Sequence, residues 1–231
     1  MGRTIAALLF LLFAVASAAY AQVGALQTGC KFGGWEAKGV YQFVSTCAGR
    51  ALSPDGRFAV VQKAYDDTQP PIELQDADGR TLARLGSLSD DMPFQVMWSP
   101  DSKWFLVNHH VGSFMDVLQV FEIVDRRAVE RPAVVKSAVD LASRRYTCLQ
   151  PDMILPNGVK WSRDSRRVVL VTISRPDACT DYGRHRGTWH SLWMIEDVAT
   201  GHIDPASVRV QRDDKPLKLP RTGAYAAFAE K

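Results

Sequence analysis

Three segments of the chain repeat one short pattern, and this repetition constrains the fold more than any other feature. Each has a serine, one further residue, an aspartate and a glycine or serine, then a basic residue and an apolar run, starting at Ser53, Ser99 and Ser162. Proline presets φ in such a turn, and aspartate accepts hydrogen bonds from nearby N–H groups. Each segment therefore predicts a β-hairpin. The turn residues that carry this prediction are Pro54, Asp55, Gly56, Pro100, Asp101 and Asp164.

Further strands are expected after each hairpin. The first hairpin is followed by strand-like residues 72–76 and 81–85, the second by 117–124, and the third by 191–197 and 202–203. A unit of four antiparallel strands in roughly 45 residues has the size and content of a propeller blade. The predicted repeats cover about residues 48–90, 94–132 and 158–205.

One short helix is predicted between the second and third repeats. The spacing from Ser99 to Ser162 is 63 residues, against 46 from Ser53 to Ser99, so an inserted element is needed. Residues 133–146 have apolar side chains at helical spacing, and a proline at position 132 suits a helix start.

The segment that runs from Trp98 to Val107, Trp-Ser-Pro-Asp-Ser-Lys-Trp-Phe-Leu-Val, resembles the WD40-like repeat of TolB-type β-propellers. The resemblance covers about residues 48–205, and it implies an all-β, propeller-like array of four-stranded antiparallel blades that serves as a protein-interaction platform. The sequence departs from the repeat at Leu52, which replaces a tryptophan, and at Arg163, which replaces the turn proline.

Three blades are fewer than a closed propeller needs, so the two ends of the chain are candidates for a fourth. On this prediction, residues 40–45 pair with 208–211 or with 224–228.

The N-terminus has the pattern of a secretory signal peptide. Arg3 supplies a positive charge, residues 5–15 are apolar, and Ala19-Tyr20-Ala21 offers a small-x-small cleavage site. An uncleaved anchor is the alternative. Cleavage after residue 21 would leave residues 22–231 as a single domain with no further long apolar stretch. We therefore expect a periplasmic or secreted protein with no membrane span after cleavage.

Four cysteines lie in the predicted mature chain, and an even number in an exported protein predicts two disulfides. The pairing closest in sequence joins Cys30 to Cys47 and Cys148 to Cys179. Crossed pairing and free buried thiols remain alternatives. A metal site is disfavoured because no CxxC spacing is present.

A long polar loop at residues 174–188 is the candidate binding element, because long loops on a scaffold often carry binding. The candidate binding residues in and just after it are Arg175, Arg184, His185, Arg186 and His190. A freely solvated loop is the alternative. The five histidines show no recurring ligand spacing, so we expect no metal or other cofactor.

The charge balance and the absence of known catalytic motifs argue against several classes of function. The formal net charge is +3, with 28 basic and 25 acidic residues and no basic run, which makes no case for nucleic-acid binding. No Gly-x-Ser-x-Gly, His-Glu-x-x-His or Gly-x-Gly-x-x-Gly motif is present. The sequence therefore predicts a non-enzymatic binding module whose partner is an envelope protein. The alternatives are a hydrolase or lyase with a site near His109, His185 and His190, and an exported inhibitor or immunity-type protein.

Overall fold

The structure is a computed structural model. It describes residues 41–44, 49–62, 72–85, 94–112, 115–146, 149, 151, 154–174, 190–212 and 219–228. The predicted signal peptide and all four cysteines lie outside these residues, so the cleavage and disulfide predictions stay predictions. In the part of the chain that the structure describes, no helix is both long and apolar enough to cross a membrane.

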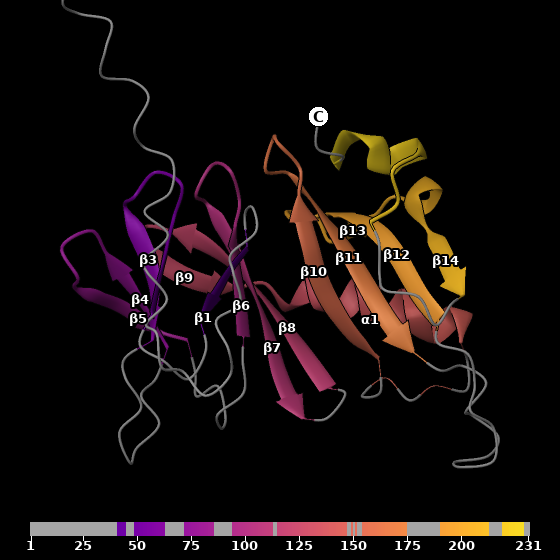
Figure 1. The fold of residues 1–231 in the computed structure, drawn as a ribbon, viewed down its shortest axis with the longest axis horizontal. Coiled ribbons are helices and arrows are strands. Elements are labelled where there is room, and N and C mark those ends of the chain that lie inside the picture. Colours follow the sequence, from indigo (N-terminus) through magenta and orange to yellow (C-terminus); the bar gives the residue numbers. More distant parts are fainter. Residues whose placement is uncertain are drawn as a thin grey trace, which may run out of the picture.

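The described chain forms three antiparallel sheets, none of which closes on itself (Figure 1). The first sheet contains β2 (Gly49–Leu52), β3 (Phe58–Gln62), β4 (Glu73–Asp76) and β5 (Thr81–Arg84). The second contains β1 (Tyr41–Val44), β6 (Phe94–Trp98), β7 (Trp104–Gly112), β8 (Met115–Val124) and β9 (Arg127–Glu130). The third contains β10 (Leu155–Trp161), β11 (Arg167–Ser174), β12 (His190–Asp197), β13 (His202–Ile203) and β14 (Arg209–Arg212). The prediction of a β-rich fold is confirmed.

Each predicted hairpin is present as an antiparallel pair, β2 with β3, β6 with β7 and β10 with β11. The fourth residue of each turn has a positive φ: 71° at Gly56, 62° at Ser102 and 61° at Ser165. Glycine adopts this conformation freely, whereas serine does so only at a cost in strain. The two serines therefore need a reason to be there, and their hydroxyl groups supply it.

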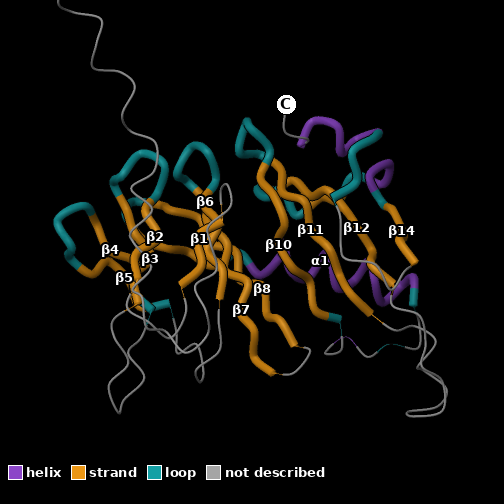
Figure 2. The backbone as a smooth tube through the Cα atoms, viewed as in Figure 1, coloured by secondary structure: helices purple, strands orange, loops and turns teal. Residues whose placement is uncertain are grey.

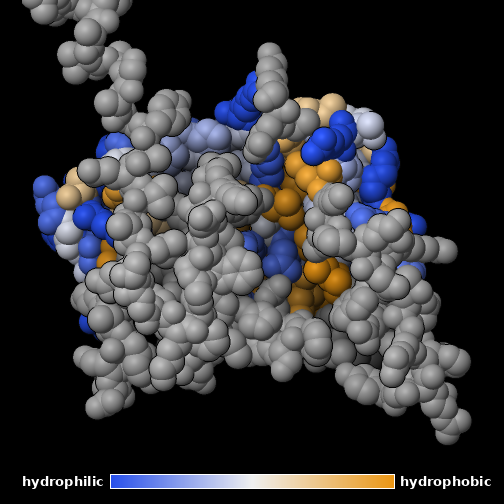
Figure 3. Space-filling model, in the orientation of Figure 1, coloured by the Kyte–Doolittle hydropathy of each residue, from blue (hydrophilic) through white to orange (hydrophobic). Residues whose placement is uncertain are grey.

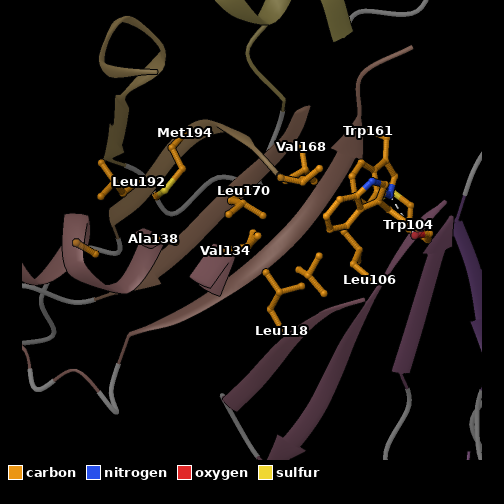
Figure 4. Packing of buried hydrophobic residues seen from close by; sticks show 14 of the residues in the cluster. Trp104, Leu106, Leu118, Val134, Ala138, Trp161, Val168, Leu170, Leu192 and Met194 are labelled. Carbon is orange, nitrogen blue, oxygen red and sulfur yellow. Dashed lines mark hydrogen bonds between the residues drawn. The ribbon is translucent and has the colours of Figure 1, made fainter. Parts of the chain in front are cut away.

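The sheets pack face to face through two apolar clusters. In β7, Phe105 and Val107 belong to the cluster with the first sheet, whereas Leu106 belongs to the cluster with the third. This alternation follows from the two-residue period of a strand. Figure 4 shows the cluster between the second and third sheets, where Trp161 lies beside Trp104 and Leu106. Trp98, Trp104 and Trp161 are therefore buried at sheet boundaries, whereas Trp193 belongs to a third cluster on the outer face of the third sheet.

The predicted helix is α1 (Pro132–Arg145), with proline in its first turn. It lies behind the third sheet in Figure 1, and its buried residues Val134, Ala138 and Ala142 join the cluster between the second and third sheets. The side chains of Arg144 and Arg145 stand in its last turn, where positive charge is favourable.

The prediction that the two ends of the chain pair with each other is wrong. β1 pairs with β6, and β14 pairs with β12 beyond the short β13. Between β13 and β14, the 3-10 helix η3 (Pro205–Ser207) places the Ser207 hydroxyl 2.8 Å from the Ile195 N–H, which donates to it. Each end strand thus completes an existing sheet edge, which satisfies more backbone groups than an isolated two-stranded pair would.

The outer faces of the two end sheets are closed in different ways. On the third sheet, the 3-10 helix η4 (Gly223–Phe228) packs Tyr225 and Phe228 against a cluster that includes Trp193. On the first sheet, Glu73 accepts hydrogen bonds from Gln75 and Thr81. Glu73 is itself buried at 4% exposure, so these hydrogen bonds satisfy a buried carboxyl group on that face.

Candidate interaction surface

The three hairpin turns lie along one edge of the molecule, the upper edge in Figure 2. We call residues 53–57, 99–103 and 162–166 the turn row. In each turn the serine O–H donates to the aspartate Oδ1, at 2.7 Å, 2.7 Å and 2.5 Å in chain order. The N–H two residues after the aspartate donates to the same oxygen. The three turns are therefore built by one hydrogen-bond pattern.

Neighbouring turns are also bonded to each other. The Asp55 N–H donates to Ser102 Oγ at 3.1 Å, and the Asp101 N–H donates to Ser165 Oγ at 2.9 Å. These bonds account for serine at a positive φ, because glycine would offer no acceptor to the preceding turn. The first turn has Gly56 at the matching position. No hydroxyl group is needed there, because in the described chain no sheet packs on the outer face of the first sheet.

A second set of bonds joins the sheets just below the turns. The Trp98 indole N–H donates to the carbonyl of Ala51, and that of Trp161 donates to the carbonyl of Met97, both at 3.1 Å. Leu52 occupies the matching position in the first repeat and has no described sheet to reach. The departures of the first repeat from the pattern thus fall where contact with a preceding sheet would be made.

Asp55 and Asp164 of the turn row have lowered pKa values. The Ser162 hydroxyl and the Arg166 N–H lower the pKa of Asp164. Burial opposes ionisation at Asp55, but hydrogen bonds from the Arg57 N–H and Ser53 still leave its pKa below the ordinary value. Their carboxylates are occupied inside the turns, so the side chains of Arg57, Lys103, Arg163 and Arg166 are the exposed cations of the row.

The binding loop predicted from the sequence is mostly outside the described residues, including Arg175, Arg184, His185 and Arg186. His190 is described, and it is not a loop residue: it begins β12, is 7% exposed, and its ring centroid lies 5.7 Å from that of Tyr146. Its place under the end of α1 follows from pairing with β11, which the polar sequence around it did not indicate.

The alternative catalytic site is not assembled by the histidines that are described. His109 continues the face of β7 that meets the first sheet, whereas His190 continues the face of β12 that meets α1. Within the described chain there is also no group of three histidine, cysteine or acidic residues that could hold a metal ion.

Sequence reasoning missed a set of arginines around the third turn and η4, which we call the arginine patch. It consists of Arg163, Arg166 and Arg167 at the third turn, Arg209 beside Gly223 of η4, and Arg221, which precedes η4 in the sequence. Part of it was visible in the sequence as Arg163 in place of the turn proline. The rest depends on how β14 and η4 fold back onto the sheet, which no local pattern indicates.

Comparison with known proteins gives no relative from which to transfer a role. Neither the protein-family models, nor the curated proteins, nor the solved structures contain a match to this chain.

Proposed function

We propose that this chain is an exported, non-enzymatic binding module that docks another envelope protein along its turn row. The observation that carries the proposal is the bonding of the three turns into one unit by hydroxyl groups of the following turn. A surface whose backbone is already fixed loses little conformational entropy when a partner binds.

A propeller-like blade arrangement is part of the same proposal. Its support is that successive sheets are related by the same two contacts, the tryptophan-to-carbonyl bond and the N–H-to-serine bond. Repeated contacts of this kind are what a stack of structural repeats requires. We propose an open array of three blades, since none of the three described sheets closes on itself and η4 covers the outer face of the third.

The side chains at the tips of the turns suit a binding role. Lys103 is exposed, and Arg57 is exposed but held by Asp55 at 2.6 Å. Charged groups of this kind at the rim of an interface chiefly set the orientation and rate of association.

Affinity capture from envelope extract tests the proposal. The bait is the mature chain, and the test variant is Arg57→Ala with Lys103→Ala. The matched control, Lys136→Ala with Arg144→Ala, removes two positive charges from α1. We expect the native chain and the control to capture one envelope protein in stoichiometric amount. The turn-row variant should capture at least tenfold less of it. Equal capture by all three baits, or no capture, would contradict the proposal.

A further inference from the structure

We propose that the arginine patch is the part of this surface that recognises the partner, and that it binds a carboxylate-rich segment of a protein. This inference rests on the proposed binding function and adds the chemistry of the partner. It concerns the end of the turn row above the third sheet, where Figure 3 shows hydrophilic residues around the β10–β11 turn.

Three segments distant in the sequence bring the patch together. The guanidinium of Arg167 lies over the ring of Phe228, 5.8 Å from its centroid, which links the β10–β11 turn to η4. Arg209 Nη2 lies 3.5 Å from the position that a Cβ on Gly223 would occupy, which links β14 to the same helix. Since Phe228 is buried in the cluster on the third sheet, the folded core places Arg167.

The charges of the patch are only partly offset within the described chain, where Asp164 interacts electrostatically with Arg167 and Arg166. No ion pair joins any of its five arginines to a described carboxylate, in contrast to Arg57 with Asp55 and Arg126 with Asp76. The nearest acid in sequence, Asp164, already accepts from its own turn. The patch therefore has guanidinium groups to offer to a partner.

The third repeat departs from the other two in the direction of positive charge. Arg163 occupies the position of Pro54 and Pro100, and Arg167 occupies the position of Phe58 and Trp104. Arg167 has a role within the fold, because its guanidinium packs over the ring of Phe228. Arg163 replaces a proline that would favour the turn, so arginine at this exposed position gives no benefit to the hairpin itself and indicates a role outside the fold.

An arginine side chain favours a partner that holds carboxylates in a defined geometry, because the planar guanidinium group can donate two parallel hydrogen bonds to one carboxylate. It is also among the residues that contribute most to protein–protein binding. The exposed Asp164 between Arg163 and Arg166 disfavours a uniformly anionic surface, such as a lipid headgroup layer or a nucleic-acid backbone. A protein segment can place its carboxylates at the arginines and leave the aspartate unopposed.

Isothermal titration of the purified mature protein with a synthetic glutamate-rich 20-residue peptide tests the inference. The test variant is Arg163→Glu with Arg166→Glu, and the control is Arg144→Glu with Arg145→Glu, which makes the same change in net charge on α1. We expect the native chain and the control to bind the peptide, and the affinity of the test variant for the peptide to be at least tenfold lower. Binding should also be weaker at high salt. A glutamine-rich peptide of the same length should not bind.

Three results would overturn the inference: equal peptide binding by both variants, no peptide binding, or tighter binding of anionic lipid vesicles or duplex DNA than of the peptide. The proposed function is judged separately, because its capture experiment leaves the patch intact. If capture depends on Arg57 and Lys103 while the peptide does not bind, the binding module stands and the acidic partner is wrong.

Discussion

The indole N–H of Trp161 donates to the carbonyl of Met97 and so fastens the third sheet to the second at their shared turn edge. The bond from Trp98 to Ala51 does the same one sheet earlier. These buried contacts hold the turn row in register, so they link the packing of the core to the shape of the proposed binding surface.

Loss of one such bond should measurably weaken the protein. Trp161→Phe removes the donor and leaves a buried carbonyl without it, and we expect a loss of about 1–3 kcal/mol in the free energy of unfolding. Urea denaturation measures the change. Trp104→Phe is the control, because Trp104 lies in the same cluster and makes no hydrogen bond between sheets with a described residue. Equal losses would show that packing, not the hydrogen bond, stabilises this boundary.

The aspartates of the turn row should stabilise their hairpins. Asp101→Ala and Asp164→Ala each remove an acceptor used by a serine O–H and a backbone N–H, at a cost of about 1 kcal/mol. Because hydrogen bonding lowers the pKa of Asp164, its contribution is present above the ordinary aspartate pKa and is lost as pH falls through the lowered value. Unchanged melting temperatures at neutral pH in both variants would contradict this role.

Glu196 has the opposite pH behaviour. It is fully buried on β12, and its Oε1 lies 2.6 Å from Ser137 Oγ, which itself lies 2.9 Å from the Val134 carbonyl. The Ser137 O–H can donate to either oxygen, and Glu196 Oε2 is buried with no hydrogen-bond partner among the described residues. Burial raises the pKa of Glu196 to about 8, and the neighbouring Asp197 adds to the effect.

Glu196→Gln should therefore stabilise the protein, and more so at pH 8 than at pH 5. Between the ordinary pKa of 4.5 and the folded value of about 8, the unfolded chain is ionised while the folded chain keeps its proton, so stability falls as pH rises. A neutral amide removes that dependence, with a gain of about 1–3 kcal/mol at pH 8. Thermal unfolding across this pH range measures it, and identical pH profiles for the two proteins would contradict the assignment.

Gly158 marks a close approach between the second and third sheets. Its N–H and carbonyl are both bonded to the Asn108 side chain at 2.8 Å, and an added Cβ would lie 2.4 Å from Leu106 Cδ2. We expect Gly158→Ala to cost about 1–3 kcal/mol. Combining it with Leu106→Ala in a double-mutant cycle should recover part of that loss, whereas strictly additive losses would place the strain elsewhere.

The sequence predicted the elements that local patterns specify. The turn chemistry at Pro54 and Pro100 indicated hairpins, and the extra residues before Ser162 indicated α1. Local patterns did not indicate which strands the end segments pair with, because β1 and β14 join strands distant in the chain. The arginine patch was missed for the same reason: η4 contacts both Arg167 and Arg209, and its packing on the third sheet is not indicated by any local pattern.

Site-specific photocrosslinking tests the central claim most directly, because it reports contact without altering the charge of the rest of the turn row. A photoreactive phenylalanine analogue replaces Lys103 at the turn row in one protein and Lys136 on the exposed face of α1 in another, and both are irradiated in envelope extract. We expect one discrete crosslinked protein from position 103 and none from position 136. The same adducts from both positions, or adducts from position 136 alone, would contradict docking along the turn row.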